Sequence, residues 1–132
     1  MMDRMLHQHA HIIIDGAQAL LNLTDGPLTE KQTRIVKTII ANAERFVHIY
    51  AEFQSVPFEV FAANKSMRHE MGTPLTPING YAELLMMGAL GALNTAQQHH
   101  VQRICESTNQ LRLAVEMIVN EARLQMAALP TA

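Results

Sequence analysis

The sequence predicts an all-α protein, folded as an antiparallel up-down four-helix bundle built from two repeated helical hairpins. Apolar residues recur at alternating steps of three and four along most of the chain, which is the spacing of one helix face. This pattern occurs twice, with the second copy 65 positions after the first. Short turn sequences separate the apolar stretches, so consecutive helices are expected to lie antiparallel and to bury their apolar faces together.

Four helices are expected, near residues 4–23, 29–54, 57–87 and 94–127. Residues 29–32 fit a capping box, and residues 94–97 supply a cap acceptor followed three positions later by Gln. Pro57 suits the first turn of the third helix, and the link 55–57 is short enough to place that helix beside the second. The apolar seams of the second and fourth helices are Val36, Ile39, Ala43, Phe46, Tyr50 and Phe53, matched by Val101, Ile104, Thr108, Leu111, Val115 and Ile118.

The repeat continues upstream with an apparent shift of one residue. Residues 14–21 match residues 78–85 at an offset of 64, which a one-residue insertion in the connecting loop would reconcile. This alignment pairs Met5 with His69 and Leu6 with Glu70. The chain is therefore interpreted as one domain, residues 1–132, in which the hairpin 1–55 is a degenerate copy of the hairpin 56–132.

Composition excludes several classes of protein. With 48% hydrophobic residues the chain is globular, and ten Lys+Arg against twelve Asp+Glu give no cationic face for nucleic acid. No apolar run is long enough to span a membrane, and the N-terminus lacks the order of a secretory signal. The single cysteine, Cys105, excludes an intrachain disulfide, and we expect it to be a buried thiol. The lack of disulfides is typical of the reducing cytoplasm. His7 and His11 lie one helical turn apart, but without a third ligand a solvated face is favoured and no metal site is expected.

The third helix contains an unusual run of helix-breaking residues. Pro74 cannot donate to the carbonyl of Glu70, nor Pro77 to that of Thr73, so the helix should bend and leave carbonyl groups without helical partners. On a helical wheel His69 lies about 160° from the buried seam, and Thr73 lies within about 40° of His69. Both side chains are therefore expected to point into solvent.

The stretch His69-Glu70-Met71-Gly72-Thr73-Pro74-Leu75 resembles the H-box of the histidine-kinase dimerisation and phosphoacceptor domain. The resemblance covers about residues 61 to 125. It implies that His69 is the phosphoacceptor, that Glu70 is its acid/base partner, and that Thr73 helps to position water for phosphatase chemistry. A neutral imidazole can act as the nucleophile toward phosphorus, which agrees with this assignment. Gly72 departs from the family, which usually carries Arg or Lys at this position.

The resemblance also implies the partners. No Asn-rich box or Asp-x-Gly-x-Gly motif of an ATP-binding domain occurs in the sequence, so the phosphoryl group should come from a receiver aspartate or a separate kinase catalytic domain. No cofactor is expected on this chain, and Mg²⁺ is expected in the partner receiver. Asn79 and Glu83 are the expected contacts for a response-regulator receiver. The chain would then be a phosphotransfer domain that accepts and passes a phosphoryl group on His69, or the phosphoacceptor part of a sensor histidine kinase. The alternative is a docking module that binds a receiver or kinase without being phosphorylated.

The resemblance and the repeat together suggest a fused pseudodimer. Family domains of this kind form homodimeric four-helix bundles with two acceptor histidines, whereas this chain appears to carry both hairpins and one acceptor. A monomeric pseudodimer is expected, with a hairpin-swapped dimer through the link 55–57 as the alternative.

Overall fold

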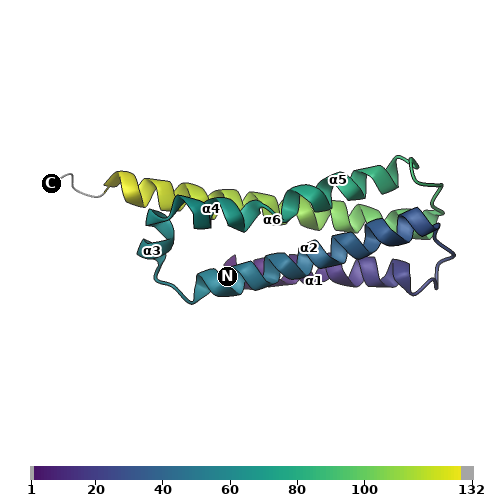
Figure 1. The fold of residues 1–132 in the computed structure, drawn as a ribbon, viewed down its shortest axis with the longest axis horizontal. Helices are drawn as coiled ribbons and strands as arrows, with labels where there is room; N and C mark the ends of the chain where they lie inside the picture. Colours follow the sequence, from purple (N-terminus) through teal and green to yellow (C-terminus); the bar gives the residue numbers. More distant parts are fainter. Residues whose placement is uncertain (1, 129–132) are drawn as a thin grey trace.

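Four long rods form the bundle in a computed structural model that describes residues 2–128 (Figure 1). The first two rods are α1 (Met2–Leu21) and α2 (Glu30–Gln54). The third consists of α3 (Phe58–Ala63), α4 (Lys65–Gly72) and α5 (Leu75–Met86), and the fourth is α6 (Thr95–Ala128). Both α1 and α5 pack against α2 and α6, so the rods close into an antiparallel ring. The predicted all-α, up-down bundle is confirmed, and residues 2–128 contain no strand.

Matching capping boxes begin the second and fourth rods. The Gln32 backbone N–H donates to Thr29 Oγ1 at 3.0 Å, and the Thr29 N–H donates to Gln32 Oε1 at 2.8 Å. Asn94 and Gln97 form the same pair of bonds, at 2.8 Å and 3.0 Å. These bonds satisfy backbone donors that the first turn of a helix leaves free, which explains why α2 and α6 begin where they do.

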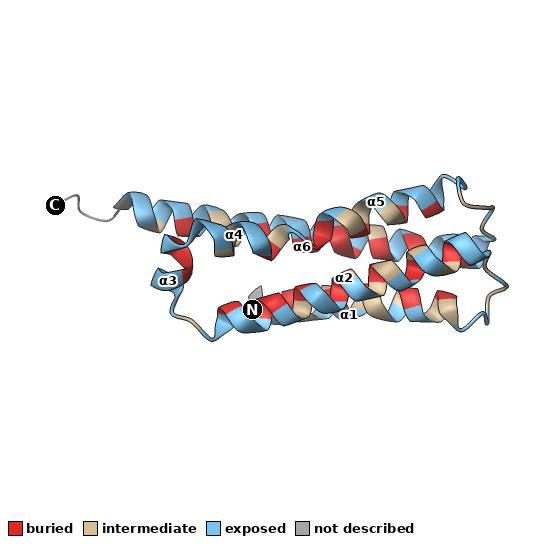
Figure 2. Cartoon of the chain, in the orientation of Figure 1, coloured by how far each residue is buried: buried red, intermediate tan, exposed pale blue. Residues whose placement is uncertain are grey.

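Buried residues recur along all four rods (Figure 2), and those of the two hairpins follow a single register. In α1 the buried positions are Leu6, Ala10, Ile13, Ala17 and Leu20, and each lies 65 residues before a buried position of the third rod: Met71, Leu75, Ile78, Ala82 and Leu85. The offset of 65 thus holds along the whole repeat, without the inserted residue that the sequence alignment required. The predicted pairing of Met5 with His69 and of Leu6 with Glu70 is wrong, because Leu6 is fully buried and Glu70 is exposed. By burial, Arg4 is the counterpart of His69.

The third rod differs from the single bent helix predicted for residues 57–87. Asn64 has an extended backbone (φ −105°, ψ 101°) that ends α3, and its side chain accepts the Met67 N–H at 3.1 Å to begin α4. Phe61 of α3 packs on Phe53 of α2, with ring centroids 5.6 Å apart. This contact turns α3 across the end of the bundle, between the end of α2 and the start of α4 (Figure 1). Tertiary packing and an asparagine cap therefore interrupt the helix at a point where the apolar pattern shows no break.

Reciprocal hydrogen bonds join the two hairpins at the far end of the bundle. Gln32, 1% exposed, donates from Nε2 to the Gly91 carbonyl at 3.0 Å, and Gln97, 3% exposed, donates from Nε2 to the Pro27 carbonyl at 3.1 Å. Thr29 Oγ1 likewise donates to the carbonyl of Leu90. Each α-helical cap thus also bonds the turn of the other hairpin.

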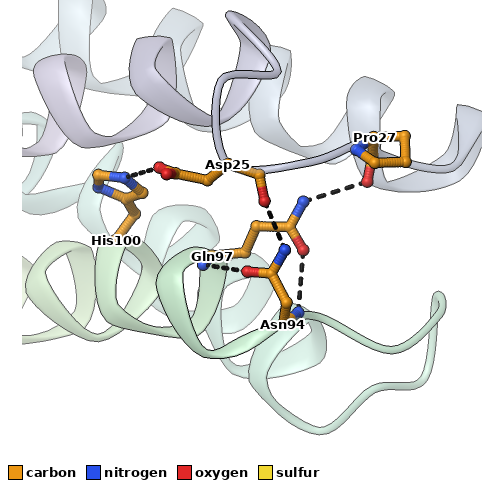
Figure 3. Close-up of polar contacts among 5 residues, drawn as sticks. All are labelled: Asp25, Pro27, Asn94, Gln97 and His100. Atoms are coloured by element: carbon orange, nitrogen blue, oxygen red, sulfur yellow. Dashed lines mark hydrogen bonds and ion pairs between the residues drawn. The ribbon is translucent and has the colours of Figure 1, made fainter.

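Figure 3 shows one of these two junctions, in which the Asn94 side chain donates to the Asp25 carbonyl. Beside it, His100 Nε2 lies 2.7 Å from Asp25 Oδ2, within hydrogen-bond distance. Gly26 and Gly91 adopt positive φ angles of 122° and 127° at equivalent places in the two turns. A Cβ at Gly26 would lie 2.9 Å from Asn94 Nδ2, and one at Gly91 would lie 3.0 Å from a Thr29 methyl, so both turns need glycine on two counts.

Across residues 2–128, no helix combines the length and apolarity that crossing a bilayer requires.

Candidate functional site

The candidate site lies on α4, whose first turn is fixed by Asn64. The Asn64 carbonyl accepts the Arg68 backbone N–H at 3.2 Å, which adds to the side-chain bond to Met67. The Arg68 guanidinium donates to the carbonyl of Ala62 in α3. Since α3 and α4 are joined through both backbone and side chain, the orientation of α4 depends on how α3 packs across the end of the bundle.

His69 is exposed on the last full turn of α4, on the face that the helical-wheel argument predicted. Met71, two residues later, is 2% exposed and anchors the opposite face of the helix in the core. The Thr73 hydroxyl, also exposed, donates to the His69 carbonyl at 3.1 Å. Thr73 therefore helps to close the turn that carries the imidazole, in addition to any role toward water.

Proline shapes the junction that follows the site. Pro74 has no backbone N–H that could donate to the Glu70 carbonyl. The Thr73 N–H donates to that carbonyl instead, at 3.2 Å. Thr73 (φ −56°, ψ −42°) and Pro74 (φ −69°, ψ −19°) both keep helical angles, so α4 passes into α5 without leaving the helical region. Pro77 lies inside α5, in its first turn, where a missing N–H costs little.

A surface hollow with three cationic side chains surrounds His69. Its lining consists of Lys65, Arg68 and His69 from α4 together with Val119 and Arg123 from α6. Lys65 precedes His69 by one helical turn, and Arg68 is its immediate neighbour, whereas Arg123 comes from the last rod. An incoming group that reaches the imidazole therefore meets positive charge from two helices.

Glu70 and Gly72 complete the segment. Glu70 is exposed, and within residues 2–128 its carboxylate forms no hydrogen bond or ion pair with the His69 ring. Because Glu70 directly follows His69 on the helix, the Glu70 carboxylate is free to turn toward an occupant of the site. A Cβ at Gly72 would lie 3.7 Å from Val115 Cγ1, which is ordinary van der Waals contact. A side chain at position 72 is therefore sterically allowed, and this chain simply lacks the usual cation there.

Asn79 and Glu83 lie on α5, beyond the proline junction. Asn79 is partly buried and Glu83 is exposed, and the Asn79 side-chain amide lies 3.5 Å from Glu83 Oε1. Glu83 also lines a shallow hollow with Met86, Met87 and Cys105, between α5 and α6. The structure thus places these two residues together, but on a different helix from His69.

His7, His9 and Cys105 have neighbours away from His69. His7 lies 3.7 Å from Asp3 and packs edge-on against Tyr50, and His9 is 3.3 Å from Ser107 Oγ. In the described part of the chain, no three His, Cys, Asp or Glu side chains are grouped so that they could hold a metal ion. Burial, with smaller contributions from two nearby glutamates, raises the pKa of the Cys105 thiol, which disfavours the reactive thiolate.

Sequence reasoning overlooked the cations around His69. Lys65 could have been found from its helical spacing, because it lies four positions before the acceptor, and Arg68 as the residue directly before it in the sequence. Arg123 could not, because it lies 54 positions further along the chain and reaches the site only through the packing of α4 on α6.

Comparison with protein families identified the family to which the chain is similar. The model of the His Kinase A (phospho-acceptor) domain matches residues 62–127, which is half of the chain and includes α4, α5 and nearly all of α6. No match was found among curated proteins or among solved structures.

Proposed function

The chain belongs to the His Kinase A (phospho-acceptor) domain family of two-component signalling, and on this premise we propose that His69 exchanges a phosphoryl group with a response-regulator aspartate. The single observation that carries the proposal is the exposed His69 imidazole at the H-box position, in a hollow lined by cations. A buried ring could not reach an acyl phosphate held in another protein. The donor in a relay would be a phosphorylated receiver or a separate kinase catalytic domain.

The transfer step follows from the chemistry of imidazole. A neutral ring presents a nitrogen lone pair to the phosphorus of an aspartyl phosphate, while its other nitrogen carries a proton. The new N–P bond forms as the P–O bond to the aspartate breaks, and the aspartate leaves as a carboxylate with the electron pair. Glu70 would take the remaining ring proton, leaving a neutral imidazole ring that carries the dianionic phosphoryl group. Mg²⁺ would be supplied by the receiver and would offset the charge of the phosphoryl oxygens.

We propose further that a single chain forms the bundle as a fused pseudodimer. The common register of 65 and the reciprocal bonds of Gln32 and Gln97 support two equivalent hairpins packed about an approximate twofold axis. Arg4 stands where the second acceptor would be, so each bundle would hold one phosphoryl group. Light scattering should give the mass of one chain, and the mass of two chains would favour a hairpin swap through residues 55–57.

The phosphoacceptor role is tested by labelling. The protein is incubated with a labelled phospho-receiver, or with a separate kinase catalytic domain and ATP, and the label is assayed for acid lability and base stability. We expect the label in the wild type and in His99→Gln, which changes another exposed histidine, but not in His69→Gln. Label that persists in His69→Gln would assign the reaction to another residue.

The second candidate function is docking without phosphorylation, favoured by the missing cation at Gly72. It predicts that a receiver binds the wild type and His69→Gln equally, and that no donor labels either protein. Titration calorimetry with an unphosphorylated receiver, run beside the labelling assay, separates the two functions.

A further inference from the structure

Three basic side chains line the hollow at the acceptor, and within residues 2–128 none of them forms an ion pair with a carboxylate. Within residues 2–128, no Asp or Glu oxygen lies within 4.0 Å of the charged nitrogens of Lys65, Arg68 or Arg123. All three nevertheless line the hollow that contains His69. In a chain with a net charge of −2, this places a local excess of positive charge at the site of phosphoryl transfer.

The arrangement of the cations favours an anion as occupant. Neighbouring like charges repel one another, and an anion in their midst adds attractive interactions that offset this repulsion. Arg68 is held in place before any ligand arrives, because its guanidinium donates to the Ala62 carbonyl. Val119 contributes an apolar wall, beside which charge interactions are less weakened by water.

We propose that Lys65, Arg68 and Arg123 form a binding site for the phosphoryl dianion at His69. They would hold its oxygens both as it arrives and after the N–P bond has formed. These cations would take the place of the Arg or Lys that the family usually carries at position 72. The positive charge would then come from the turn before the acceptor and from α6. The inference deepens the proposed function and rests on it for its role, but the anion site itself is measurable without any transfer.

The test uses inorganic phosphate and the chain of residues 1–132. Phosphate is titrated at constant pH and constant ionic strength, balanced with chloride, while the ring signals of His69 are followed by NMR and assigned with His69→Gln. We compare the wild type with Lys65→Gln/Arg123→Gln. The matched control is Lys31→Gln/Arg34→Gln, which removes two exposed cations from α2. Arg68 is left intact in this test because of its bond to α3.

We expect the His69 signals to shift with phosphate and the double variant to bind it about tenfold more weakly, because two surface charges near a dianion are lost. The control should bind as the wild type does. Equal affinity in the wild type and the double variant, or no His69 shift in the wild type, would overturn the site. A protein that binds phosphate there but never takes label would instead contradict the phosphoacceptor role and leave the anion site standing.

Discussion

Gly16 and Gly80 provide the sharpest test of how the bundle is packed. The sequence aligns Asp15-Gly16 with Asn79-Gly80, but the two glycines have opposite surroundings. A Cβ at Gly80 in α5 would meet nothing within 4 Å. A Cβ at Gly16 in α1 would lie 3.3 Å from Ile104 Cγ1 and 3.5 Å from the His100 carbonyl. The same substitution by alanine should therefore stabilise the protein at Gly80 and not at Gly16.

The magnitudes follow from two competing effects. Alanine in place of an exposed glycine within a helix favours folding by about 1 kcal/mol. For a chain of this size, about 2.1 cal/mol/K of unfolding entropy per residue converts 1 kcal/mol into a shift of about 3–4 °C in Tm. Gly80→Ala should show this full gain. At Gly16 the methyl group must displace Ile104, and overpacking of roughly 1–3 kcal/mol offsets or exceeds the gain.

Thermal and urea unfolding, followed by circular dichroism, measure both variants against the wild type. We expect Gly80→Ala to raise the free energy of unfolding and Gly16→Ala to leave it unchanged or lower it. The two variants differ only in the neighbours of the new methyl group, so each controls for the other. A stabilisation by Gly16→Ala equal to that by Gly80→Ala would refute the close approach of α1 to α6.

Three further predictions concern single side chains. Gln97→Met leaves two backbone partners without a hydrogen bond and should lower the free energy of unfolding by about 2–4 kcal/mol. The control Gln102→Met, at an exposed position, should change the free energy of unfolding by less than about 0.5 kcal/mol. Equal losses in the two variants would contradict the role of Gln97 in joining the hairpins. Burial, aided by the hydrogen-bonded carboxylate of Asp3, holds the pKa of Tyr50 above its usual value. The contribution of Tyr50 to the free energy of unfolding is therefore fully present below about pH 10 and is lost as the pH rises further. Between about pH 9 and pH 11, the free energy of unfolding should therefore fall less for Tyr50→Phe than for Tyr81→Phe or the wild type. Asn64→Ala removes the cap of α4 and should cost about 1 kcal/mol, with faster amide exchange in its first turn; unchanged exchange there would show that the cap is unimportant.

The apolar period was enough to predict the four rods, because it reports which face of each helix is buried. The caps were also predictable, since Thr29 and Gln32 bond within one turn of the chain. The break at Asn64 was missed, because it depends on Phe61 meeting Phe53 across the end of the bundle. A local pattern carries no information about that contact.

The register of the repeat shows how local likeness can mislead. The match between Asp15-Gly16 and Asn79-Gly80 favoured an offset of 64, whereas burial of Leu6 and Met71 fixes it at 65. Only the positions that face the core constrain the register of a helix in a bundle. Exposed residues such as Gly80 are free to vary and can agree by coincidence.

The amino-acid sequence alone determined the helical class, the two capping boxes and the candidate acceptor, because periodicity, capping and the H-box each operate within a few consecutive residues. The tertiary structure alone decided that Arg123 joins the charges around His69, and which turns Gln32 and Gln97 bond. Arg123 and the two glutamines act on groups more than fifty positions away in the chain. Such contacts are set by the packing of the rods, since burying the apolar faces fixes how far each helix slides and turns against its neighbours.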